Sequence, residues 1–111
     1  MEKERLAEHL ERYHLGANSA ATSRELELTF AIKGIEVRHL VNQLRRDGVP
    51  IASSGSGYFY AATEQEVRAT IAHLTRRIGG IAAAIHGLNR SLERFDTEQT
   101  RLPLLDGGDV P

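Results

Sequence analysis

The fold of this chain is decided by residues 35–61, IEVRHLVNQLRRDGVPIASSGSGYFYA. The first half of this stretch predicts a helix over residues 35–47, because its apolar residues recur three and four positions apart. These residues, which form the expected buried stripe, are Val37, Leu40, Val41 and Leu44. Gly48 follows at the position where a left-handed C-terminal cap is favoured.

The second half of the stretch predicts a β-hairpin. Residues 49–53 form a short apolar strand, which Pro50 restricts to a sheet edge because proline donates no ladder hydrogen bond. Residues 54–57, Ser-Gly-Ser-Gly, form a flexible turn, and the aromatic residues 58–60 form a second, strongly β-prone strand. We expect the three aromatic side chains to pack in the hairpin and core.

Two helices are expected before this stretch. Residues 2–13 predict the first, with one apolar stripe formed by Leu6, Leu10 and Tyr13. Thr22 and Glu25 have the spacing of a capping box, which opens a short second helix with Leu26 and Phe30 on one face. A tight connection over residues 31–34 then leads into the third helix. The order helix, helix, tight turn, helix, hairpin is that of a winged helix-turn-helix domain.

The longest element is a predicted helix over residues 64–95, opened by a second capping box at Thr63 and Glu66. Its large apolar residues recur with alternating spacings of four and three and form one seam. The seam residues are Val67, Ile71, Leu74, Ile78, Ile81, Ile85, Leu88, Leu92 and Phe95.

A seam with a period of 3.5 residues buries itself best against another helix. The chain's other predicted helices are much shorter, so we expect most of the seam to meet a second copy and to form a homodimer. Two alternatives are that the helix folds back over its own domain, or that it breaks or kinks at Gly79-Gly80. Parallel and antiparallel pairings stay open, because the residues flanking the seam carry no complementary charge code. Small residues beside the seam, such as Ala82 and Ala84, favour close helix packing.

The third helix is the expected recognition helix, with its outer face opposite the buried stripe. Asn and Gln side chains can pair with adenine and Arg with guanine, whereas Arg at the flanks can contact phosphates. We expect double-stranded DNA as the partner. The candidate DNA-binding residues on this helix and the hairpin turn are Lys33, Arg38, His39, Asn42, Gln43, Arg45, Arg46, Ser54 and Ser56.

Residues 24–60, and above all LRRDGVPI followed by GSGYFYA, resemble the winged helix-turn-helix domain of bacterial and phage DNA-binding proteins. The N-terminal domain of the biotin operon repressor is similar in the same places, and small phage proteins resemble the chain into the long helix. The resemblance implies that the third helix reads DNA and that Tyr58 closes the wing. Two features depart from the usual pattern: Lys33-Gly34 stands where Ser or Thr commonly caps the recognition helix, and the wing tip has no basic residue.

The composition and the absence of known motifs argue against several classes of function. The chain has 14 basic and 15 acidic residues and no cysteine, which excludes disulfides, thiolate metal sites and cysteine nucleophiles. It has no run of about 18 apolar residues and no secretory leader, so we expect a cytoplasmic protein that does not enter a membrane. No catalytic motif is present, and no enzyme activity, cofactor, metal or small-molecule ligand is expected. His9 and His14 are five residues apart and are not expected to share a helix face.

These observations predict a mainly α protein with a small β-hairpin. The expected parts are a winged helix-turn-helix domain over residues 1–62, a coiled-coil-like dimerisation helix over 63–95 and a flexible acidic tail over 96–111. The expected function is that of a homodimeric, sequence-specific DNA-binding protein, a transcriptional regulator of bacterial or phage type. The alternative is a winged-helix module that binds a phage replication or host protein without reading DNA.

Overall fold

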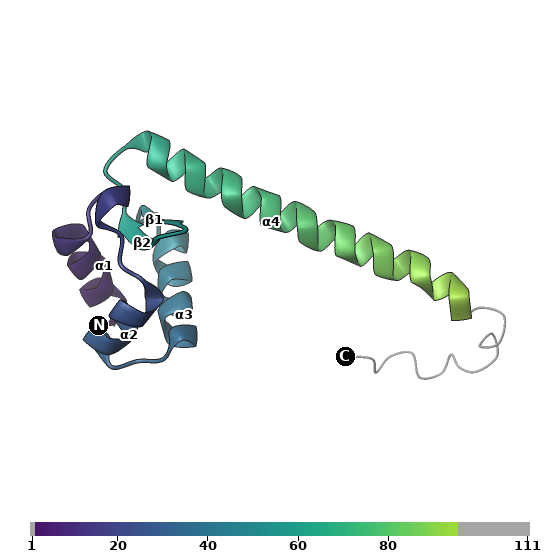
Figure 1. The fold of residues 1–111 in the computed structure, drawn as a ribbon, viewed down its shortest axis with the longest axis horizontal. Coiled ribbons are helices and arrows are strands. Elements are labelled where there is room, and N and C mark those ends of the chain that lie inside the picture. Colours follow the sequence, from purple (N-terminus) through teal and green to yellow (C-terminus); the bar gives the residue numbers. More distant parts are fainter. Residues whose placement is uncertain (1, 96–111) are drawn as a thin grey trace. The chain divides into compact units, whose positions relative to one another are not determined.

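The computed structural model describes residues 2–95, and the expected tail over 96–111 lies outside them. The protein is mainly α-helical with one two-stranded antiparallel hairpin (Figure 1). In chain order the elements are α1 (Glu2–Tyr13), the 3-10 turn η1 (Ala17–Ser19), α2 (Ser23–Phe30), α3 (Gly34–Arg46), β1 (Ile51–Ser54), β2 (Gly57–Tyr60), α4 (Glu64–Ser91) and the 3-10 turn η2 (Leu92–Phe95). The chain divides into two units with their boundary between His73 and Leu74, within α4. We refer to the described part of the first unit as the head.

The core of the head joins α1, α2, α3 and the hairpin. α1 packs against α3 and β2, and α2 packs against α3. The expected apolar stripes supply most of the core, whose largest fully buried side chains are Leu6, Leu10, Leu26, Val37 and Val41. Tyr13 was expected to extend the α1 stripe, and this prediction is wrong: its side chain is 60% exposed. It is the last residue of α1, three positions past Leu10, the last buried residue of the helix.

The helix boundaries follow local chemistry. At the start of α2, the Thr22 hydroxyl accepts a hydrogen bond from the Glu25 amide and the Glu25 carboxylate accepts one from the Thr22 amide, which confirms the capping box. α3 runs one residue earlier than expected at each end. Lysine has no acceptor for capping, but the Glu36 carboxylate accepts the Lys33 amide at 3.1 Å. Gly48 has φ +87°, as the cap prediction required.

The hairpin is the expected wing, with β1 paired to β2 from Ile51 opposite Tyr60 to Ser54 opposite Gly57. The turn itself is Gly55-Ser56, since Ser54 and Gly57 belong to the strands. On its other side β2 bonds to the chain between α1 and α2, through isolated bridges at Leu15 and Ala21. Phe59 is buried and Tyr58 and Tyr60 are half-buried, which confirms their packing role.

The long helix α4 continues through Gly79-Gly80 without a break. It ends at Ser91, and the last four residues of the expected helix, 92–95, form a 3-10 turn instead. At about 1.5 Å per residue, its 28 residues extend about 42 Å. Among residues 2–95, no helix combines the length and the apolar character needed to cross a membrane.

Candidate nucleic-acid interface and helix seam

The outer face of α3 is open to solvent. The buried stripe of α3 anchors it in the head, so the side chains on its opposite side point outward. Every candidate DNA-binding residue on this helix or at its N-cap is exposed except Arg45, which is half-buried. The exposed ones are Lys33, Arg38, His39, Asn42, Gln43 and Arg46. Groove-reading chemistry and positive charge therefore occupy one accessible helix face.

The acidic side chains of Glu36 in α3 and Asp47 at its C-cap are both hydrogen-bonded at the ends of the helix, away from its exposed basic residues. Glu36 caps the N-terminus of the helix through the Lys33 amide. Asp47, just beyond the C-terminus, accepts a 2.8 Å hydrogen bond from the Lys3 ammonium of α1. This bond raises the pKa of Lys3. The Asp47 carboxylate is thus drawn toward α1.

Arg45 contacts the hairpin. Its Nε donates to the Ile51 carbonyl at 2.8 Å, and its Nη2 donates to the Ser53 hydroxyl at 3.1 Å. The sequence indicated a phosphate contact for this residue, which remains a prediction. Sequence reasoning missed the bonds to β1, since nothing local in the sequence relates an arginine in a helix to a strand six to eight positions later.

The wing tip is small and polar. The Ser54 hydroxyl accepts a 3.1 Å hydrogen bond from the Ser56 amide, and both residues are exposed. No lysine or arginine lies between Arg46 and Arg68, so the whole hairpin lacks positive charge. A contact from this turn to a nucleic acid would use backbone amides and hydroxyls.

The first turns of α4 are joined to the rest of the head through Glu66 and Thr70. The capping box at Thr63 and Glu66 is confirmed, with the Glu66 amide donating to the Thr63 hydroxyl at 3.2 Å and the Thr63 amide donating to the Glu66 carboxylate at 3.3 Å. That carboxylate also accepts the amides of Ala62, at 2.7 Å, and of Ala17 in η1, at 3.0 Å. These amide donors, the Ala17 amide first, lower the pKa of Glu66. The second residue, Thr70, is 5% exposed and lies against β1.

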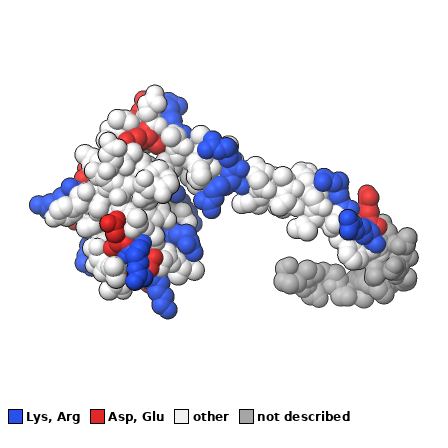
Figure 2. Space-filling view, in the orientation of Figure 1, with Lys and Arg blue, Asp and Glu red and all other residues white. Residues whose placement is uncertain are grey.

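The apolar seam of α4 is exposed in the single chain. Val67 and Leu74 are half-buried, whereas the seven other seam residues named above are 54–69% exposed. A run of twelve residues, 78–89, holds no Lys, Arg, Asp or Glu, with His86 as its one histidine, and in Figure 2 this middle part of the helix surface is white. The described chain thus presents a long uncharged surface with isoleucine and leucine along one face, far more apolar than isolated surface residues would be.

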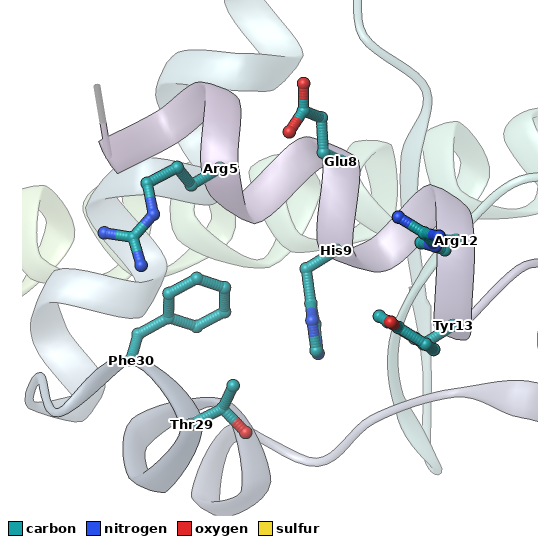
Figure 3. A pocket seen from close by; sticks show the side chains of 7 residues that line it. All are labelled: Arg5, Glu8, His9, Arg12, Tyr13, Thr29 and Phe30. Atoms are coloured by element: carbon teal, nitrogen blue, oxygen red, sulfur yellow. The ribbon is translucent and has the colours of Figure 1, made fainter.

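A shallow groove between α1 and α2 carries a cluster of rings (Figure 3). The His9 ring lies between Phe30 and Tyr13, 5.2 and 5.1 Å from their centroids, and Arg5 lies over Phe30. The His14 ring is also 5.2 Å from His9, although the two residues were not expected to share a helix face. α1 ends at Tyr13, so His14 lies outside the helix and helical rotation does not determine where its ring lies. Burial, and secondly the charge of His14, lower the pKa of His9.

The described residues hold no cluster of three or more His, Asp or Glu side chains placed to bind a metal ion. Three helices, an antiparallel hairpin and a long helix, in this order, form a winged helix-turn-helix-like arrangement. In comparisons with known proteins, the chain matches no family model, no curated protein and no solved structure. The class of fold therefore rests on the observed order and packing of the elements.

Proposed function

We propose that this chain is a homodimeric protein that binds double-stranded DNA and acts as a transcriptional regulator of bacterial or phage type. In this proposal each copy places α3 in a major groove, and the α4 helices pair along their seams. The observation that carries the proposal is the exposed outer face of α3. Arg38 and Asn42 lie one turn apart there and Gln43 is also exposed, on a helix whose other side is buried in the core.

Pairing with a second copy is supported by the length and chemistry of the seam. The other helices of the described chain have 12, 8 and 13 residues, so none is long enough to cover the 28 residues of α4. A second α4 has the same length and the same 3.5-residue period, and its seam can interdigitate with the first. Dimerisation would also remove the uncharged surface over residues 78–89 from water.

The direct test is binding of purified protein to duplex DNA, measured by fluorescence anisotropy at several salt concentrations. A phosphate contact by Arg38 predicts that Arg38→Gln weakens binding to every duplex. It should also make the slope of log affinity against log salt shallower by about one per copy, or about two for a bound dimer. Asn42→Ala is expected instead to change the preference among sequences, by about 1–3 kcal/mol at one base pair.

Arg12→Gln on α1 is the matched control, because it removes one positive charge from the head at a residue that lines the α1–α2 groove. It should leave the salt slope unchanged. Binding by Arg38→Gln that equals the parent at every salt concentration would contradict the proposed role of α3.

The alternative function is a protein-interaction module of winged-helix fold. One observation favours it: residues 1–73 carry nine lysines and arginines against ten acids, so the head has no overall positive charge to attract DNA. The same anisotropy experiment separates the two functions. A dimer that fails to bind any duplex at low salt would support the interaction module.

A further inference from the structure

Side chains from two helices form hydrogen bonds to strand β1 of the wing. Arg45 of α3 donates from its guanidinium to the Ile51 carbonyl and the Ser53 hydroxyl. The hydroxyl of Thr70 in α4 accepts the Ser53 amide at 3.2 Å. Both contacts converge on Ser53 of β1, which thereby joins α3 to α4.

Thr70 is suited to hold a fixed position. It is the one buried polar residue among residues 2–95, and its hydroxyl also donates to the Glu66 carbonyl one turn earlier at 3.1 Å. Both its donor and its acceptor functions are therefore used. Removing the hydroxyl would leave the Ser53 amide facing an apolar side chain without its acceptor, a costly arrangement in a half-buried site.

Arg45 is equally specific, since its two contacts use two separate N–H groups of one planar guanidinium. A lysine at this position would keep the charge but offer a single ammonium in place of the planar fork. The two contacts and the Thr70 bond form a continuous path from the outward-facing helix to the first turns of the long helix.

We infer that Arg45 and Thr70 are positioning residues: by holding Ser53 between them they set the orientation of the wing and of the first turns of α4 with respect to α3. The inference rests on the proposed function for its consequence in DNA binding. Two heads joined through their α4 helices read two half-sites, and the dimer geometry sets the separation between them. A helix held less firmly at its base would tolerate a wider range of separations.

The effect on DNA binding is tested by measuring affinity for duplexes that carry two copies of a bound sequence, with the spacing between the copies changed one base pair at a time. The parent should bind best over a narrow range of spacings. Thr70→Val, which keeps the shape and loses the hydroxyl, should reduce the preference for the best spacing over neighbouring spacings about fivefold, as expected for one hydrogen bond. Thr70→Ser should restore the parent's preference. A residue with a purely stabilising role would lower the melting temperature without changing the spacing preference.

Arg45→Lys provides a second variant that keeps the charge and should broaden the optimum in the same way. The orientation of the wing relative to the first turns of α4 is measured without DNA, as the distance between two spin labels attached to cysteines introduced by Gly55→Cys and His73→Cys. The chain contains no other cysteine that would be labelled. Position 55 has open space for a side chain, and His73 is exposed. The distance distribution should be narrow in the parent and Thr70→Ser, and broader in Thr70→Val and Arg45→Lys.

These experiments distinguish a failure of the proposed DNA-binding function from a failure of the proposed positioning role. If the parent binds no DNA but the two variants broaden the distance distribution, the positioning role stands and the DNA-binding function is wrong. If Thr70→Val and Arg45→Lys both fold and keep the parent's narrow distribution, the positioning role is overturned. An unchanged spacing preference in a DNA-binding parent and in both variants would overturn it as well.

Discussion

Substitution of Ile81 by alanine tests the pairing of α4 quantitatively. Ile81 lies in the middle of the uncharged segment 78–89 and is 60% exposed in the single chain. Full burial of an isoleucine side chain contributes about 1.5–3 kcal/mol, so burying this exposed part contributes about 1–2 kcal/mol per copy. A dimer loses this contribution twice, which predicts a dissociation constant raised about 30- to 700-fold.

The control is Leu28→Ala on α2. Leu28 is 68% exposed but lies outside the seam, so its substitution should leave the dissociation constant unchanged. Alanine is the best helix former, and a loss of association by Ile81→Ala cannot be attributed to melting of α4. Sedimentation equilibrium over a wide concentration range measures both constants. A parent chain that stays at its monomer mass of 12.3 kDa at high concentration, or equal dissociation constants for the parent and Ile81→Ala, would refute the reasoning.

Three further predictions concern the head. Gly57 has φ +130°, and a Cβ there would meet the Ala21 carbonyl oxygen at 2.2 Å, so Gly57→Ala should lower the free energy of unfolding by about 2–5 kcal/mol in urea denaturation. Gly55→Ala, where the Cβ meets nothing within 4 Å, should change it by less than about 0.5 kcal/mol. The lowered pKa of His9 means that the unfolded chain binds more protons below about pH 6.5, so stability should fall there on acidification and His9→Gln should flatten this fall. Because the pKa of Glu66 is lowered, the ionised carboxylate stabilises the fold above the ordinary glutamate pKa, and this stabilisation is lost as the pH falls through the lower, folded-state pKa. Glu66→Gln should therefore remove the loss of stability in this more acidic range. Thermal melts across pH measure both the histidine and the glutamate effect. A dependence of stability on pH that is the same in the parent, in His9→Gln and in Glu66→Gln would contradict the last two predictions.

The features predicted correctly are those that neighbouring residues determine among themselves. Each capping box joins residues three apart, and the left-handed Gly48 follows directly from the helix end that it terminates. The apolar periodicity of α3 likewise predicted which side of the helix would be buried, because a helix rotates by a constant angle per residue.

Two features that the spacing did not predict lie at the end of α1. Tyr13 continues the apolar spacing of α1, but it is exposed because it lies past Leu10, the last buried residue of the helix. His14 lies beyond the helix, and helical rotation did not predict the contact of its ring with His9. Periodicity carries no information about where the packing partner ends or how the chain turns afterwards.

The sequence alone determined the order of the elements, the outward face of α3 and the uncharged, heptad-spaced seam of α4, since these follow from short-range spacing and side-chain chemistry. Only the tertiary structure decided that Arg45 bonds to β1, that Glu66 reaches Ala17 and that Thr70 is buried against Ser53. These contacts join positions 6 to 49 residues apart, and their partners are selected by the packing of whole elements around the core. A hydrogen bond of this kind depends on where two backbones are brought together, which no local pattern encodes.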